Sequence, residues 1–214
     1  MTNFIPIFPL SIVVYPGESL NLHIFEPRYK QLIQECHAEQ KAFGIPTVIN
    51  NKLNEMGTLV KITEIVKTSE NGEMDIRALG VSVFRILEVI KSVPEKLYSG
   101  AIVNYPDNLE DQGKRELMAK VVNAIRELHR LLHISKDFKK PDYELTAYDI
   151  AHHAGLSLQE EYEMLGLLRE EQRQEYLKRH LSKVIPVIAE METLKERVKL
   201  NGHFKNLSSF EFED

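Results

Sequence analysis

The chain has 214 residues, of which 43% are apolar and 28% charged, with a formal net charge of −5. This composition is typical of soluble globular proteins, and no apolar run approaches the roughly 20 residues of a membrane-spanning helix. Residues 1–110 carry 10 basic and 13 acidic side chains and the remainder carries 17 and 19, so the sequence shows no basic stripe and disfavours a nucleic-acid partner. The N-terminus lacks the features of a secretion signal, and we expect a cytoplasmic protein without membrane contact.

The first half is predicted to be rich in strands. Six runs have the alternating or β-branched pattern of strands: residues 4–10, 12–15, 20–24, 58–66, 74–79 and 81–90. Prolines interrupt the first run, which is typical of an edge strand. Asn71-Gly72 separates two alternating runs, the strongest short-range signature of a hairpin, and Gly80 is expected to form a bulge or bend.

One helix is predicted to interrupt these strands. It begins at residues 26–28, where Pro27 suits a first helical turn. The following apolar residues fall on one face: Tyr29, Leu32, Ile33 and Cys36. Cys36 is therefore expected to be buried, and a single cysteine excludes an intramolecular disulfide and a multi-cysteine zinc site.

The second half is predicted to be helical. An amphipathic helix is expected over residues 112–133, a short one over 142–154 closed by Gly155, and another after the capping box Ser157-Leu158-Gln159-Glu160. A long final helix is expected to have one apolar face, formed by Leu177, Leu181, Val184, Ile188, Met191 and Val198. The charge-rich residues 169–179 are expected to be its solvated face, and Pro186 a possible kink.

These elements predict an α+β fold. The turn-like residues 105–108 divide it into a β-rich subdomain, residues 1–108, and an α-helical bundle, residues 109–214, that ends in the long helix.

Two segments carry motifs that are informative when they are taken together. The first is Phe8-Pro9-Leu10-Ser11-Ile12-Val13-Val14-Tyr15-Pro16 with the following Leu22-His23-Ile24-Phe25-Glu26-Pro27-Arg28-Tyr29. The second begins at Met56-Gly57-Thr58 and ends at Gly80-Val81-Ser82-Val83-Phe84-Arg85-Ile86. Together they resemble the N-terminal, substrate-binding domain of Lon-type proteases, a family that often has valine in place of Met56. The resemblance extends over essentially the whole chain. It implies a PUA-like pseudobarrel followed by a helical bundle.

Full Lon proteases also contain an ATPase module and a peptidase domain, whose motifs are not found in this sequence. Gly113-Lys114 has neither the preceding glycine nor the following hydroxyl residue of a nucleotide-binding loop. The residues that follow leave no room for a Ser-Lys peptidase domain. We therefore expect a free-standing, non-catalytic form of the domain, without a cofactor or a metal.

Histidine pairs are the best candidates for metal ligands. His129 and His133 are four residues apart on a predicted helix, a spacing that can place two imidazoles on one face. No third ligand is evident, and two histidines on an exposed helix flank are the alternative interpretation. His152 and His153 are adjacent, so on a helix they point about 100° apart and are a poorer pair.

Surface anchors for a partner are proposed where aromatic residues border turns. Tyr15, Phe25, Arg28 and Tyr29 are the candidates, with core packing as the alternative for the aromatic rings. His23, Glu26 and Arg28 suggest catalysis, but a carboxylate and a guanidinium near a helix start more often form a local pair. The tail Phe210-Glu211-Phe212-Glu213-Asp214 is either a frayed terminus or a docking segment.

The resemblance implies a protein-binding role, in which exposed apolar patches recognise unfolded or particular client proteins, with the chain serving as an adaptor for a separate protease. Two other functions stay open. One is an RNA-binding PUA-like module, which requires a basic groove. The other is a small metal-dependent hydrolase that uses His129 and His133. The sequence leaves the clients and the oligomeric state undetermined.

Overall fold

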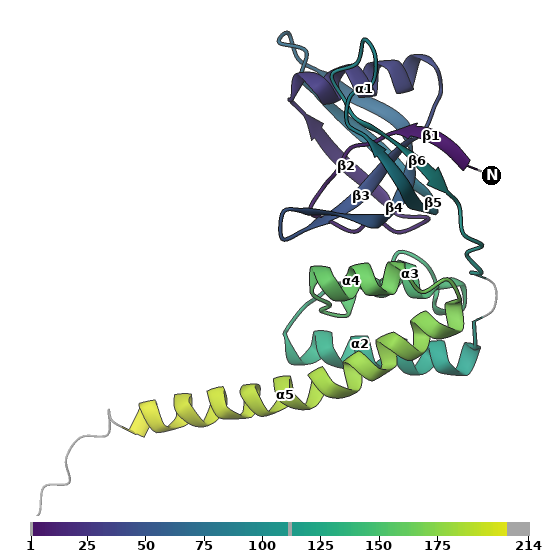
Figure 1. Cartoon of the computed structure of the whole chain (residues 1–214). Coiled ribbons are helices and arrows are strands. Elements are labelled where there is room, and N and C mark those ends of the chain that lie inside the picture. The colour runs from purple at the N-terminus through teal and green to yellow at the C-terminus, as the bar shows by residue number, and fades with distance from the viewer. Residues whose placement is uncertain (1, 111–112, 205–214) are drawn as a thin grey trace, which may run out of the picture.

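The computed structural model describes residues 2–110 and 113–204, and only the backbone of Thr2 and of residues 201–204. Strands form the first half of the chain and helices the second (Figure 1). The α+β class and the order of β-rich and helical halves are as predicted. The tail Phe210–Asp214 lies outside the described residues, so its expected docking role is not addressed by this structure.

The strands form one antiparallel sheet. They are β1 (Thr2–Pro6), β2 (Ser19–Ile24), β3 (Phe43–Ile49), β4 (Lys52–Thr68), β5 (Met74–Ile90) and β6 (Gly100–Asn104). Their order is β1-β6-β5-β4-β3, and β2 pairs with β5 beside this path. The long strand β5 is therefore shared by β2 along its first half and by β6 along its second.

The sheet closes on itself through the residues that follow β1. The Phe8 N–H donates to the Gly44 carbonyl at 2.8 Å, and the Val48 N–H donates to the Leu10 carbonyl at 2.8 Å. These bonds join the two ends of the strand order and form the pseudobarrel that the resemblance implies. The prediction of a strand over residues 12–15 was wrong, because side chains bind this backbone: Thr58 bonds to Val14 and Glu18 bonds to Tyr15.

The hairpin around Gly72 is confirmed. Gly72 has φ +76° between β4 and β5, a left-handed conformation that favours glycine. The pairing register shifts next to Gly80, where a bend was predicted. A Cβ atom on Gly80 would lie 2.2 Å from the carbonyl oxygen of Tyr15. Glycine is required there because the segment 13–17 crosses directly over β5.

Helix α1 (Pro27–Ala38) is also confirmed. Glu26 precedes it in an extended conformation and proline occupies its first turn. Its buried residues are the predicted face, Tyr29, Leu32, Ile33 and Cys36. They pack into a core with the inner faces of β2, β3, β4 and β5. The burial of Cys36 raises the pKa of its thiol to about 12, which keeps it protonated at neutral pH.

The helical half contains α2 (Arg115–Leu131), η1 (Asp142–Glu144), α3 (Ala147–Ile150), η2 (Ala151–His153), α4 (Leu158–Leu165) and α5 (Glu170–Phe204). The helix predicted over residues 142–154 is divided into three pieces, because Thr146 and Asp149 form a capping box that starts a new helix at Ala147. The predicted capping box of Ser157 and Glu160 is present at α4.

The two halves share one hydrophobic core. Val13, Tyr15, Met56 and Val83 from the β-rich half pack among the buried residues of the helices. The Tyr15 hydroxyl donates to the Glu161 carbonyl at 3.1 Å, and the Tyr15 ring stacks on Tyr148 with centroids 5.0 Å apart. Burial raises the pKa of Tyr15, so its phenol stays a hydrogen-bond donor.

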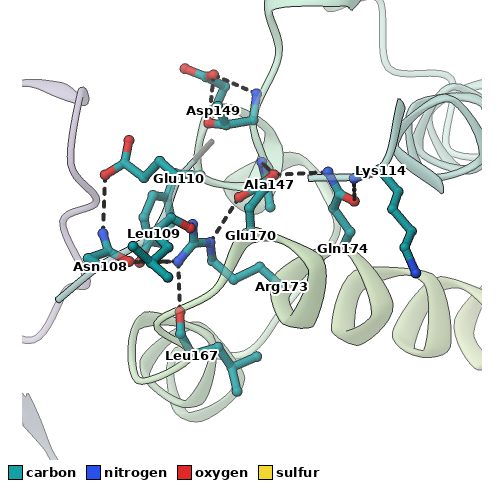
Figure 2. A network of polar contacts seen from close by, with 12 residues as sticks. Asn108, Leu109, Glu110, Lys114, Ala147, Asp149, Leu167, Glu170, Arg173 and Gln174 are labelled. Carbon is teal, nitrogen blue, oxygen red and sulfur yellow. Dashed lines mark hydrogen bonds and ion pairs between the residues drawn. The ribbon is translucent and has the colours of Figure 1, made fainter. Parts of the chain in front are cut away.

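A buried arginine organises the start of α5. Arg173 is fully buried and donates to Glu170, to Asn108 at 2.8 Å and to the Leu167 carbonyl at 2.7 Å (Figure 2). Its guanidinium also lies 4.1 Å from the centre of the Tyr148 ring. One side chain thus connects the residues before α2, the start of α3 and the loop between α4 and α5.

Glu170 and Gln174 extend this network. The Glu170 carboxylate accepts from the Ala147 N–H at 2.7 Å and from Gln174 at 3.2 Å, and Gln174 accepts from the Lys114 N–H at 2.9 Å (Figure 2). Burial raises the pKa of Glu170, which the Ala147 N–H and Arg173 oppose. The prediction that residues 169–179 form a solvated face was therefore wrong for Glu170, Arg173 and Gln174, which are at most 2% exposed.

We predict that Arg173→Met destabilises the protein by about 3–5 kcal/mol, because it leaves the Glu170 carboxylate buried without its cation. Urea unfolding followed by circular dichroism measures the change. Arg179→Met is the matched control, since Arg179 is exposed on the same helix, and it should change stability by less than about 0.5 kcal/mol. Equal effects of the two substitutions would contradict the role of the network.

Gly80→Ala should cost about 2–3 kcal/mol of unfolding free energy, because the added methyl group meets the Tyr15 backbone and forces it to move. Thermal unfolding of this variant and of Val81→Ala, at the exposed neighbouring position, provides the comparison. A Gly80→Ala protein as stable as Val81→Ala would show that the crossing segment can shift without cost.

Candidate functional site

Two of the four predicted surface anchors lie in the core. Tyr15 is 0% exposed, between the β-rich half and the helices, and Tyr29 is 6% exposed, with its ring stacked on Phe8. Neither ring is available to a partner in this structure. The proposal that they are surface anchors is corrected here in favour of core packing, because both rings are covered by residues distant in the sequence.

The other two anchors, Phe25 and Arg28, are on the surface. Phe25 is 58% exposed between the end of β2 and the start of α1. The His23 ring lies alongside it, with centroids 6.0 Å apart, and His23 is held by Asp75 at 2.7 Å. We call His23, Phe25 and Arg28 the β2–α1 corner.

Local contacts hold the charged part of the corner. Arg28 pairs with Glu26 at 2.7 Å, and its guanidinium lies 4.5 Å from the centre of the Tyr29 ring. Glu26 and Arg28 thus form the local pair expected at a helix start. The corner thus presents an exposed aromatic ring with an imidazole alongside it, and a guanidinium on the first turn of α1.

The histidine pair considered as a metal site is separated. His129 is buried on α2, whereas His133 lies beyond the end of the helix with φ +54° and a side chain 85% exposed. The expectation that both lie on an exposed helix flank was wrong for His129. Among residues 2–110 and 113–204, no group of three His, Cys, Asp or Glu side chains could hold a metal ion. The described residues therefore give the hydrolase hypothesis no metal centre.

A cluster of charges joins the two halves at His152. Its Nδ1 lies 2.7 Å from Glu161 on α4, and its Nε2 lies 3.2 Å from Glu18 in the turn before β2. Burial alone would lower the pKa of His152, but its hydrogen bonds to Glu161 and Glu18 raise it to about 10. The imidazole is therefore protonated at neutral pH and bridges two carboxylates across the joint.

Several hollows of the surface lie in or beside the helical half. One of about 530 Å³ lies between α2 and η1 and is lined by both apolar and charged side chains, with Met118, Val122 and Tyr143 among them. Another of about 320 Å³ lies beside His152, between the turn at Gly17 and the lysines around Lys139. Between the two halves, Tyr15 and its neighbours pack into the shared core.

Sequence reasoning missed both polar clusters of the helical half. Glu18 and His152 are 134 residues apart, and no local pattern links them. A signal did exist for the network of Arg173. Glu170, Arg173 and Gln174 precede Leu177 and Leu181 at helical spacing, so they continue the buried face of α5 toward its start.

We predict that His152 makes stability depend on pH. Its pKa is raised from 6.5 to about 10 on folding, so its stabilisation is fully present below pH 6.5 and is lost as the pH rises through 10. Between these values the wild type should lose more unfolding free energy than His152→Asn, as measured by urea unfolding. His133→Asn, at an exposed histidine, should follow the wild type, and parallel profiles of wild type and His152→Asn would contradict the assignment.

No helix within the described parts of the chain has the length and apolar character needed to cross a membrane. Two solved structures share the fold. The Lon N-terminal domain protein from Xanthomonas campestris matches with a TM-score of 0.62 and 23% identity, over 82% of this chain and 96% of that one. The N-terminal domain of Mycobacterium avium complex Lon protease matches with a TM-score of 0.59 and 14% identity, over 84% of this chain and 98% of that one.

The family model of the ATP-dependent protease La (LON) substrate-binding domain matches residues 5–183, most of the chain. The strand order, the helical half and this match agree with one another, and the chain belongs to the LON substrate-binding domain family.

Proposed function

We propose that this chain is a non-catalytic polypeptide-binding module that recognises unfolded or particular client proteins and acts as an adaptor for a separate protease. Membership of a substrate-binding family supports the binding role. Polypeptide is the substrate class that this family membership implies, and a client exposes apolar side chains that a surface aromatic group can contact.

The observation that carries the proposal is the exposure of Phe25 at the β2–α1 corner. A large aromatic ring that is 58% exposed, with the His23 ring alongside it and Arg28 three residues further on, brings together an aromatic and an arginine side chain, which are enriched at protein interfaces. The ring can cover an apolar client side chain, while the imidazole and guanidinium offer hydrogen bonds to carbonyl groups at the rim.

Buried neighbours and ion pairs hold the residues of the β2–α1 corner in place. Ile24 is 1% exposed and Tyr29 is 6% exposed, so the residues on both sides of Phe25 are fixed in the core. Asp75 on β5 holds His23, and Glu26 holds Arg28. A partner therefore meets groups whose positions are already set, which lowers the entropy lost on binding.

Phe25→Ala should weaken binding of an unfolded chain about tenfold, the loss expected for a hot-spot aromatic group. The probe is a fluorescein-labelled protein that has been reduced and carboxamidomethylated, so that it cannot refold, and fluorescence anisotropy measures its Kd. Tyr143→Ala is the matched control, because Tyr143 is an aromatic residue 82% exposed on the helical half.

Equal losses from Phe25→Ala and Tyr143→Ala would contradict the corner as the binding surface. Absence of binding to the wild type would contradict the function itself. Displacement of the probe by a single-stranded RNA, with affinity that falls steeply with salt, would favour the RNA-binding alternative.

A further inference from the structure

The last turns of α5 carry an apolar stripe outside the shared core. Four residues, separated by four, three and four positions, form it, with exposed fractions of 56%, 51%, 60% and 63% in chain order: Val187, Met191, Leu194 and Val198. We call these residues the α5 stripe. At 100° per residue they fall within an arc of about 60°, which is the narrow seam of a two-helix contact rather than a core-facing side.

The α5 stripe does not point toward the body of the protein. Leu177 and Leu181 are fully buried and Ile188 packs against the same core, and this face is turned by roughly 90° from the stripe. The helix also runs past the other helices (Figure 1), and the end of α2 approaches it at His133 and Glu192, 4.0 Å apart. The stripe thus stays open while α5 packs in its own bundle.

The spacing of the stripe is that of a coiled-coil seam. Met191 and Val198 take the a positions, and Val187 and Leu194 take the d positions. When two copies of such a helix run antiparallel, each a residue faces a d residue of the other copy. Met191 then faces Leu194 and Val187 faces Val198, so every member of the stripe meets another member.

Charges beside the stripe match in the same arrangement. Glu190 and Arg197 occupy the g positions that flank the seam. In an antiparallel pair, the g positions of one helix face the g positions of the other beside the seam. The register that places Met191 against Leu194 therefore also places Glu190 of each copy against Arg197 of the other. In a parallel pair, Glu190 would instead face Lys195 of the other copy, a lysine that already pairs with Glu192 on its own helix at 2.5 Å.

We propose that the α5 stripe binds a second copy of this chain, as an antiparallel two-helix coiled coil with its twofold axis between Glu192 and Thr193. The apolar side chains drive the association, and the Glu190–Arg197 pairs favour the antiparallel direction because they leave the Glu192–Lys195 pair of each helix in place. We favour a second copy over a client chain as the binding partner. When the helix is paired with a second copy in the opposite direction, each apolar residue of the stripe meets another one and Glu190 meets Arg197.

Sedimentation velocity over a range of protein concentrations tests the association. The wild-type mass should rise from one chain to two, and Leu194→Glu should remain a monomer at the concentration where the wild type is fully paired. Thr193→Glu is the matched control, since it adds the same charge at an exposed position outside the stripe, and it should pair as the wild type does. Circular dichroism verifies that each variant is folded.

Cysteine cross-linking tests the direction. Val187→Cys and Val198→Cys lie about 16 Å apart along the helix, too far for a disulfide between identical positions of an antiparallel pair. Oxidation should therefore link the two variants only when they are mixed, whereas a parallel pair would link each variant to itself. The native Cys36 is buried and should not react.

Two results would overturn the proposal. One is a wild type that stays monomeric at every concentration; if its affinity for the unfolded probe also falls on Leu194→Glu, the α5 stripe is a client surface. The other is Leu194→Glu pairing as well as Thr193→Glu.

Discussion

The position of the helices depends on one buried guanidinium. Arg173 satisfies the carbonyls of Leu109 and Leu167 and bonds to Asn108, so it fixes the connection that precedes α2 and the loop that precedes α5. Its plane also supports the Tyr148 ring, which in turn stacks on Tyr15 of the β-rich half. An unpaired charge in this core would strongly raise the free energy of the folded state. The helices therefore pack in the arrangement that gives the Arg173 guanidinium its hydrogen-bond partners. The alignment of the two halves follows from that arrangement.

Local signals were sufficient to predict most of the elements. The β4–β5 hairpin, α1 and the capping box of α4 each depend on residues close in the sequence, such as Gly72 or Ser157 and Glu160. The segment 142–154 was predicted less well, because a second cap at Thr146 interrupts it. Amphipathic spacing also placed the buried face of α1 correctly, since a helix has one geometry whatever it packs against.

Contacts between distant residues explain what could not be predicted. The burial of Tyr15 depends on Glu161, which is 146 residues away, and the pairing of His152 with Glu18 is equally remote. Arg173 was misassigned because charge normally indicates solvent, although its spacing from Leu177 indicated the core. Phe25 and Arg28 were placed on the surface correctly because the turn between β2 and α1 is itself a local feature.

The β2–α1 corner and the free end of α5 lie at opposite ends of the molecule (Figure 1). Two chains joined through α5 would direct their corners away from each other. A single polypeptide could reach both only if it were long and extended, whereas a folded protein or a short peptide would occupy one. Bivalent attachment would then multiply weak individual affinities for long unfolded chains alone. Discrimination between clients would thus come from chain length and extension, with little demand on the sequence of either binding segment.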